Sequence, residues 1–500
     1  MKKGFDTDLY LKKQTEEILN RIKHFKNKLY LEIGGKLYAD YHAARVLPGF
    51  DPDAKIKILN KIKDNIEIIY CIGAPQLEEK KIRGHSGLSY NEQAIKEINH
   101  IKNKGLDITK VVISQYKYQK QANLFKEHLE NLGFKVYTHH FIQNYPNDLN
   151  NILSEEGYGK QEHIKTKKKI VVVIGTGPGS GKLSTCLTNI YLDSKKGMDS
   201  GYAKLETFPI WNLELKHPIN IAYESATADL GDYNIIDPFH LKAYNKETVN
   251  YNRDVEAFKI IKKMFSYLVS EDNYTRSYKS PTDMGINMAG FAITDDEIVR
   301  EAAKQEIVRR YFDYKKNFLR GKIRKKVVER AEKIMKEIGL SEDYRKVVEK
   351  AREAMEECKE KNKGHKMVYC GTAIMLNNGE MIKGKNSELL HSESSAILNA
   401  IKKLANISDE KEILDEEIIK QVNYLKRNIL KKGKLASLNV EETLVCLAVS
   451  AYKNKNTKKA FENIKKLRDC ELHSTHMFSG GDESGLRKLK MNATTDGRRI

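Results

Sequence analysis

The fold is decided by the stretch IVVVIGTGPGSGK, residues 170–182, in which a run of aliphatic residues leads into a glycine-rich turn that ends in a lysine. An unbroken β-branched run of this kind is typical of a buried parallel strand. A helical pattern then continues to Leu192. Strand, glycine loop and helix in this order make an anion site, because the loop amides and the helix N-terminus carry partial positive charge. We therefore expect a parallel α/β sheet that binds phosphate at this loop.

Four further strands are predicted ahead of this stretch, and each is rich in β-branched or aromatic residues: residues 28–33, 66–72, 110–114 and 135–141. Amphipathic helical patterns at residues 91–103 and 118–132 lie between them. Strands that alternate with helices predict a parallel sheet. The expected fold class is α/β, with an N-terminal parallel sheet that includes the glycine-loop strand.

The chain is expected to have four parts. They are an N-terminal α/β domain (1–165), the glycine-loop strand with a loop-rich, irregular region (166–292), a helical subdomain inserted after it (293–364) and a C-terminal α/β subdomain (365–500). In the last part, Asn378-Gly379 predicts a hairpin turn and residues 392–404 predict a helix. The polar residues 494–500 are expected to be flexible.

Composition limits the classes of function. Lys and Arg number 88 against 68 Asp and Glu, and the resulting net charge of +20 attracts anions. The excess is mostly lysine along helix faces, without the arginine and aromatic pattern of base recognition, so nucleic acid is not an expected partner. No apolar run is long enough for a membrane helix and no signal peptide is visible, so a cytoplasmic protein without a membrane partner is expected.

The glycine loop resembles the phosphate-binding loop of the nucleoside triphosphatases. The resemblance implies ATP or GTP with magnesium, with Lys182 on the β and γ phosphates and Ser184 or Thr185 on the metal ion. The backbone that would cradle phosphate is that of Gly175, Gly177, Gly179, Ser180 and Gly181. Leu183 separates the lysine from the hydroxyl residues, which leaves the magnesium geometry open.

Two other interpretations of the loop remain open. One is a dinucleotide site with pyrophosphate at Gly175-x-Gly177-x-x-Ser180, which lacks an evident acidic residue about 20 positions further on. The other is a glycine-rich turn without a ligand. Elsewhere in the chain, Arg45 can clamp a phosphate after the first strand, and residues 83–87 (Arg-Gly-His-Ser-Gly) offer similar donors after the second.

Ionisable residues gather after the glycine loop. The catalytic candidates are Glu224, Asp229, Asp237 and His240, with Glu224 the first choice for a base or metal ligand. Asp237 and Ser184 are the expected metal ligands, since carboxylate and hydroxyl oxygens suit magnesium opposite a phosphate. The alternative is that these carboxylates cap helices and neutralise lysines.

A hairpin followed by His391-x-Glu393 resembles the core of the cytidine deaminases, in which the histidine ligates zinc and the glutamate shuttles protons. That family also needs Pro-Cys-x-x-Cys on the next helix, and residues 394–500 do not supply it. We therefore expect a deaminase-like topology without working zinc, and leave open whether His391 and Glu393 belong to any site.

Taken together, several motifs resemble a bacterial family of unknown function with members of about this length. The motifs are YLEIGGK (30–36), YHAARVLPGF (41–50), the glycine loop, ETFPIWNL (206–213) and IDPFH (236–240). Some members carry the label ATP-dependent zinc protease, but this chain has no His-Glu-x-x-His helix to support it. The resemblance supports the architecture and does not name the reaction.

The expected function is an enzyme that binds a nucleoside triphosphate or another phosphorylated small molecule and catalyses phosphoryl transfer or hydrolysis. The alternative is a non-catalytic nucleotide or metabolite sensor that assembles as a homo-oligomer. A zinc-dependent nucleoside deaminase is the third and least favoured hypothesis. The sequence names neither the substrate nor the phosphoryl acceptor.

Overall fold

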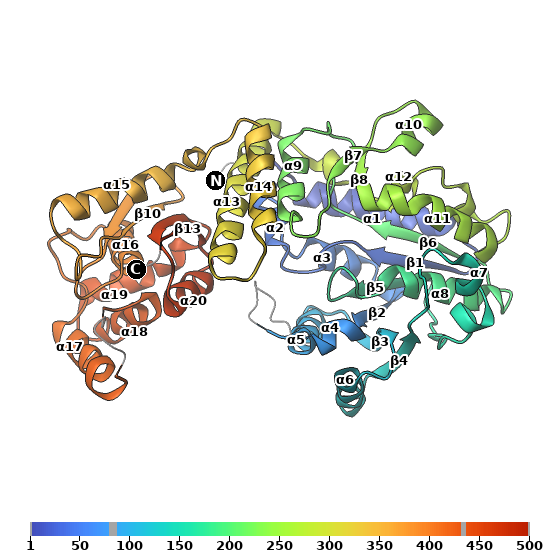
Figure 1. The fold of residues 1–500 in the computed structure, drawn as a ribbon, viewed down its shortest axis with the longest axis horizontal. Coiled ribbons are helices and arrows are strands. Elements are labelled where there is room, and N and C mark those ends of the chain that lie inside the picture. Colours follow the sequence, from blue (N-terminus) through green and yellow to red (C-terminus); the bar gives the residue numbers. More distant parts are fainter. Residues whose placement is uncertain (1–2, 80–87, 432–436, 499–500) are drawn as a thin grey trace. The chain divides into compact units, whose positions relative to one another are not determined.

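The computed structural model describes residues 3–79, 88–431 and 437–498 (Figure 1). Its contacts divide the chain into two compact units, a first unit that ends at Ala303 and a second that begins at Lys304. Helix α13 (Asp296–Leu319) contains this boundary. None of the described helices has the length and apolar character needed to cross a membrane.

Within the described residues, the first unit is built on a seven-stranded sheet in which all neighbouring strands run parallel, in the order β4-β3-β2-β5-β1-β6-β9. The strands are β1 Lys28–Ile33, β2 Ile66–Gly73, β3 Ile108–Tyr116, β4 Lys135–His140, β5 Ile170–Gly175, β6 Ser200–Leu205 and β9 Gly285–Ile286. The α/β class, the five predicted strands and the place of the glycine-loop strand inside the sheet are confirmed. The central strands β1 and β5 are buried almost throughout, which explains their continuous apolar pattern.

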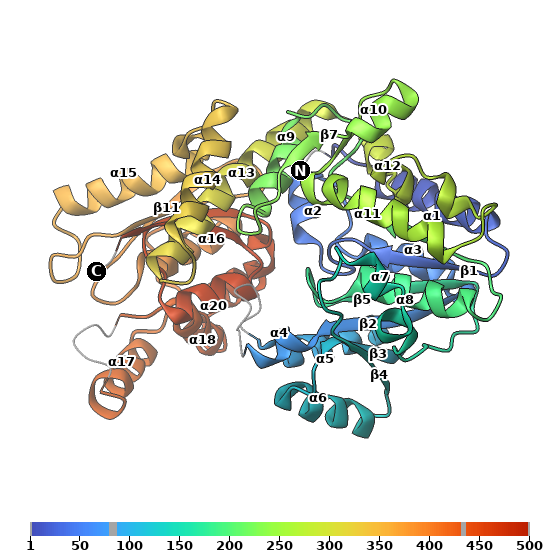
Figure 2. The same cartoon turned by 45° about the vertical axis from the view of Figure 1, so that its right-hand side comes forward.

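Helices connect these strands. Those of the first unit are α1 Thr7–Lys23, α2 Tyr41–Val46, α3 Ala54–Lys61, α4 Ala74–Glu78, α5 Tyr90–Asn103, α6 Lys120–Asn131, α7 Leu149–Ile152, α8 Lys182–Ser194, α9 Pro218–Ala226, α10 Pro238–Tyr244, α11 Asn252–Leu268 and α12 Pro281–Met284. Helix α8 packs on β1, β5 and β6, and α11 packs on α8 (Figure 2). Tyr30, Val171 and Tyr202 of these strands belong to the same apolar core cluster as residues of the two helices. This core holds the glycine-loop strand and the helix after it in place.

The stretch 202–251, expected to be irregular, contains several short elements. Strand β6 overlaps its start and pairs along its whole length with β1, and β7 (Asn234–Ile236) pairs antiparallel with β8 (Val249–Tyr251). Helices α9 and α10 also lie here. Strands of three residues and helices of two turns are too short to give a readable period, so only their long-range pairing reveals them.

The second unit carries a four-stranded mixed sheet in the order β11-β10-β12-β13 among its described residues. Its strands are β10 Gly371–Met375, β11 Met381–Lys385, β12 Glu471–His476 and β13 Asn492–Arg498, and only β12 and β13 run parallel. Its helices after α13 are α14 Lys325–Glu337, α15 Lys346–Glu360, α16 Ser392–Leu404, α17 Glu416–Tyr424, α18 Val440–Ser450, α19 Lys455–Glu462 and α20 Gly480–Lys488. The predicted hairpin and the predicted helix 392–404 are confirmed.

The expectation of a flexible polar C-terminus is wrong for the residues described. Strand β13 is the edge of the second sheet, and Thr494 and Thr495 are buried. Arg345, itself fully buried, donates to the Thr494 hydroxyl and the Glu471 carboxylate. Polar residues form this strand because buried charged and hydroxyl groups of the same unit satisfy their side chains.

Candidate functional site

The glycine loop lies at a point where the direction of the sheet reverses. After β2 the chain moves outward to β3 and β4, whereas after β5 it moves the opposite way to β6. Right-handed crossovers then send the helices that follow β2 and β5 to opposite faces. The carboxyl ends of these two neighbouring strands therefore flank a topological switch point, where open parallel sheets bind their ligands.

The loop takes a conformation that depends on its glycines. Gly177, Gly179 and Gly181 all have positive φ, and Gly181 caps α8 with φ +84°. Side chains from the neighbouring strand ends bind the loop carbonyls: Gln76 donates to Pro178 O at 2.9 Å, Gln115 to Gly179 O at 3.0 Å and Ser114 to Ser180 O at 2.9 Å. The ends of β2 and β3 thus hold the loop through its carbonyl groups.

Several backbone amides of the loop, in contrast to its carbonyls, have no partner among the described residues and are available to a ligand. Within the part of the chain that the structure describes, the amides of Gly179, Gly181, Lys182 and Leu183 donate no hydrogen bond. They precede or open a 13-residue helix, whose N-terminus adds partial positive charge. The loop therefore presents unsatisfied amide donors next to a helix start.

Lys182 adds a full positive charge to these donors. Its Nζ lies 3.4 Å from Gly177 O, folded back over the loop. No carboxylate of the described residues forms an ion pair with it, whereas Lys55 and Lys204 each have one. An ammonium without a counterion beside free amides is the electrostatic pattern of an anion site.

The three hydroxyl candidates of the loop have different surroundings. Thr185 is fully buried and its Oγ1 accepts from Cys71 Sγ at 3.5 Å, so it faces the sheet core. Ser184 is half-buried beside the Tyr145 and Tyr158 hydroxyls. Ser180 is fully buried below Gly175, and its Oγ has no hydrogen-bond partner among the described residues. Ser184 is therefore the hydroxyl best placed to reach a ligand.

An acidic group that the sequence analysis had not selected stands on the strand next to the loop. Glu32 is buried at the end of β1, which pairs with β5, and it accepts from the Tyr202 hydroxyl at 2.9 Å. Burial raises the pKa of the Cys186 thiol on α8, and both Glu32 and Lys182 are close enough to act on it. Glu32 thus belongs to the neighbourhood of the glycine loop; its place at a strand end was the available sequence signal.

Beside Glu32 lies a half-buried set of charges at the end of β6 and the start of α11. Lys204 Nζ is 2.6 Å from Glu206 Oε1 and 2.8 Å from Asp254 Oδ2. Burial raises the pKa of Glu206, Lys204 opposes this shift, and the Asp254 and Glu32 carboxylates add to it. Glu206 also acts on the pKa of Lys55, so this edge of the sheet holds two ammonium groups among its carboxylates.

The loop after β1 is held by hydrogen bonds from a lysine of α3. Lys55 is buried, donates to Gly34 O and Lys36 O, and lies 3.7 Å from Asp40 Oδ2. Burial lowers the pKa of this lysine. Arg45 lies half-buried in the last turn of α2, which follows this loop. The segment Arg83–Gly87 lies outside the described residues.

The predicted catalytic residues gather around other elements. Asp237 caps α10, and its oxygens accept from Phe239 N, His240 N and Thr282 Oγ1. His240 Nδ1 lies 3.0 Å from Ser280 Oγ, and burial lowers its pKa. In the described chain, the hydrogen bonds of these two residues hold α10 against α12 and none reaches the glycine loop. An Asp-Pro pair at a helix start is a capping signal, and it explains this placement.

The other two acidic candidates have separate positions. Glu224, half-buried in α9, accepts from Asn234 N at 3.2 Å and so braces β7. Asp229 is exposed in the turn after α9. Tyr223, next to Glu224, lies among Asp40, Glu206 and Lys204, which all act on its pKa. Helix α9 therefore approaches the charged edge of the sheet through its tyrosine.

In the second unit, His391 and Glu393 meet a carboxylate from a distant part of the chain. His391 Nδ1 lies 2.8 Å from Asp482 Oδ2, at the start of the helix between β12 and β13. Burial and Asp482 raise the pKa of Glu393, while the imidazole lowers that of Asp482. Cysteine was the ligand type expected in this region, and Asp482 was not among the predicted site residues. All six cysteines of the chain are buried and reduced.

Comparison with known proteins places both units in one set of bacterial sequences. Residues 3–339 match the domain of unknown function DUF1846, N-terminal, and residues 343–498 match its C-terminal counterpart. A "UPF0371 protein" of Clostridium tetani is 45% identical over 496 residues, which cover 99% of this chain and 98% of the relative. Similar proteins of Streptococcus thermophilus strain LMD-9 (44%, 99% and 97% covered) and Clostridium botulinum strain Kyoto (46%, 99% and 98% covered) carry the same description.

Proposed function

The chain belongs to the DUF1846 family of bacterial proteins of unknown function, and we propose that it binds a nucleoside triphosphate or another phosphorylated small molecule at the glycine loop and catalyses phosphoryl transfer or hydrolysis there. The observation that carries this proposal is the Lys182 ammonium, which has no acidic partner among the described residues and lies over a loop with free amides. Phosphate is the common biological anion that such a combination binds.

Each group near the loop has a distinct task in this proposal. The free amides of Gly179, Gly181, Lys182 and Leu183 would hold one phosphate, and the Lys182 ammonium would neutralise the next phosphate of the ligand. Magnesium, which such reactions use, would neutralise further phosphate charge, with Ser184 as the hydroxyl ligand. Phosphoryl transfer depends mainly on positioning and charge neutralisation, so this inventory is chemically adequate.

We assign the acidic role to Glu32 in place of Asp237. Both oxygens of Asp237 are occupied by helix-capping and threonine donors, whereas Glu32 accepts from one side-chain donor among the described residues, the Tyr202 hydroxyl. A carboxylate at the end of the strand beside a phosphate loop is well placed to orient the attacking hydroxyl or water, or to hold a metal-bound water. Glu224 remains a candidate that acts through α9, if its side chain turns toward the ligand.

Binding is tested by thermal unfolding with ATP, GTP, NAD or pyrophosphate, each with and without magnesium, because selective binding raises the melting temperature. We expect a magnesium-dependent rise with a triphosphate, and its loss in Lys182→Ala. Lys195→Ala is the matched control, since Lys195 is an exposed lysine next to the other end of the same helix. Equal shifts in wild type and Lys182→Ala, or no shift with any of the four compounds, would contradict the proposal.

The second candidate function is a nucleotide or metabolite sensor without turnover, assembled as a homo-oligomer. The burial of Thr185 against Cys71 favours it, because the usual magnesium hydroxyl is then not at the loop. Glu32→Gln separates the two functions. An enzyme should keep triphosphate binding and lose phosphate release in this variant, whereas a sensor shows no phosphate release even in the wild type.

A further inference from the structure

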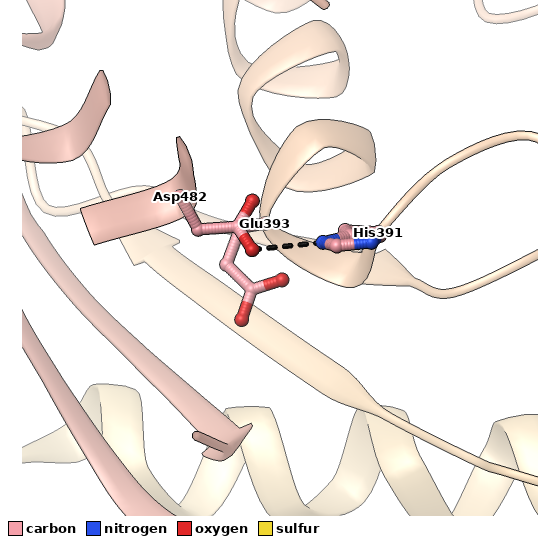
Figure 3. A group of neighbouring side chains, drawn as sticks. All are labelled: His391, Glu393 and Asp482. Carbon is pink, nitrogen blue, oxygen red and sulfur yellow. Dashed lines mark hydrogen bonds and ion pairs between the residues drawn. The ribbon is translucent and has the colours of Figure 1, made fainter. Parts of the chain in front are cut away.

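Three side chains of the second unit converge where two helices begin, and the proposed phosphate site does not use them (Figure 3). His391 precedes α16, Glu393 lies in its first turn, and Asp482 lies in the first turn of α20. Each offers one ligand atom, an imidazole nitrogen or a carboxylate oxygen, and these three atoms lie within 4.8 Å of one another. Figure 3 shows the imidazole pointing toward the two carboxylates.

Within the part of the chain that the structure describes, the two carboxylates of this cluster share a single basic group, the His391 imidazole. Glu393 is 5% exposed and Asp482 is 1% exposed. Among the described residues, neither carboxylate forms an ion pair with a lysine or arginine, and His391 is the one basic partner of Asp482. Two buried carboxylates with a single imidazole are costly unless a further positive charge is bound.

The carboxylates are also held in fixed orientations by donors outside the cluster. Ser474 Oγ donates to Glu393 Oε1 at 2.6 Å, and Ser392 Oγ donates to Oε2 at 3.2 Å. Val440 N donates to Asp482 Oδ1 at 2.9 Å. Ser479 N and Oγ donate to Asp482 Oδ2, at 3.2 and 2.6 Å. Metal ligands in proteins are typically oriented by such outer hydrogen bonds.

We propose that His391, Glu393 and Asp482 form a binding site for one divalent transition-metal ion. The 2.8 Å between His391 Nδ1 and Asp482 Oδ2 fits two adjacent ligands of an octahedral ion, whose bonds are about 2.1 Å long. One imidazole with two carboxylates suits manganese or zinc, because nitrogen ligands favour zinc and oxygen ligands favour manganese.

The site has access to solvent for the ion and for water ligands. The His391 side chain is 29% exposed, whereas the carboxylates are buried behind it. Three protein ligands leave coordination positions for water, as metal sites with a chemical function do. Working zinc was not expected because residues 394–500 hold no Pro-Cys-x-x-Cys motif. Asp482 supplies the third ligand from a helix that periodicity could not connect to His391.

The experiment measures metal binding to the full chain without added nucleotide. Chain freed of metal by a chelator is titrated with Mn²⁺, followed by electron paramagnetic resonance, and with Zn²⁺, followed by calorimetry. We expect one ion per chain, and binding weaker by at least about tenfold in Glu393→Gln, which keeps the size of the side chain and removes its charge. Glu483→Gln is the matched control, because Glu483 neighbours Asp482 on α20 but pairs with Lys316 and Arg320 instead.

Two results would overturn the proposal. One is the absence of stoichiometric uptake of either ion by the wild type, which would leave a hydrogen-bonded His391–Asp482 pair only. The other is unchanged binding in both Glu393→Gln and His391→Ala. Thermal unfolding of the metal-free variants checks that they fold, and the wild-type stoichiometry decides the question even where a variant does not.

Discussion

Replacement of Gly181 by alanine should destabilise the first unit more than the same replacement at a glycine of equal backbone conformation. Gly181 has φ +84°, and a Cβ atom built there would lie 2.4 Å from Ser114 Oγ and 2.5 Å from Ser114 Cβ. Gly133 has φ +85°, and a Cβ atom there meets nothing within 4 Å. In both variants, the left-handed backbone conformation destabilises an alanine by about 1–2 kcal/mol relative to glycine. Only in Gly181→Ala does a steric clash destabilise the folded state by about 1–3 kcal/mol more.

The assay is urea unfolding followed by tryptophan fluorescence. Trp211 is the single tryptophan of the chain and lies in the first unit with both glycines, so its signal reports the unfolding of that unit. We expect Gly181→Ala to lose about 2–5 kcal/mol and Gly133→Ala about 1–2 kcal/mol, with unchanged urea dependence. Adding Ser114→Gly to Gly181→Ala removes the side chain that the new Cβ atom meets. The double variant should therefore regain the part of the unfolding free energy that was lost to the clash. Equal losses of unfolding free energy in the two alanine variants would refute the reasoning, because the Ser114 side chain would then not limit the space at Gly181.

Three further outcomes follow from buried polar groups. Burial lowers the pKa of His139 from 6.5 to about 4. The contribution of this histidine to stability is therefore complete above pH 6.5 and is lost as the pH falls to 4. Between these pH values, urea titrations should show that the wild type loses up to about 3 kcal/mol more unfolding free energy than His139→Gln does. Arg345→Ala should destabilise the second unit by about 3–5 kcal/mol in calorimetry, because it leaves the Glu471 carboxylate without its buried partner. A chain that ends at Met491 should lose the cooperative unfolding of the second unit, since β13 covers the edge of its sheet; retention of a native transition by that chain would contradict the assignment of β13 as a structural strand.

Signals confined to a few adjacent residues were sufficient for much of the fold. The apolar run at 170–174 with its glycines gave a strand and a loop, and the Asn378-Gly379 pair gave a hairpin. The helix at Ser392–Leu404 was predicted to the residue. These features depend on backbone preferences and on one apolar face, and both are written locally in the chain.

The composition of the candidate sites was decided by contacts between distant segments. Because β5 lies between β1 and β2 in the sheet, Glu32 of β1 is on the strand next to the glycine loop. Asp237 instead caps α10, and its oxygens are used there. Packing of α20 on α18, which also contacts α16, brings Asp482 to His391. Strand order is set by hydrogen bonding and core packing across the whole unit, for which residue spacing gives no signal.

The sequence by itself therefore determined the parallel α/β class, the glycine-rich loop after the fifth strand and the positions of most strands, because periodicity and glycine spacing are local properties. Only the tertiary structure decided which carboxylate lies on the strand beside the glycine loop, which one contacts His391, and that the polar C-terminal residues form a buried strand. The physical reason is that a polar side chain can be buried wherever a partner meets it, and the partner here comes from elsewhere in the chain.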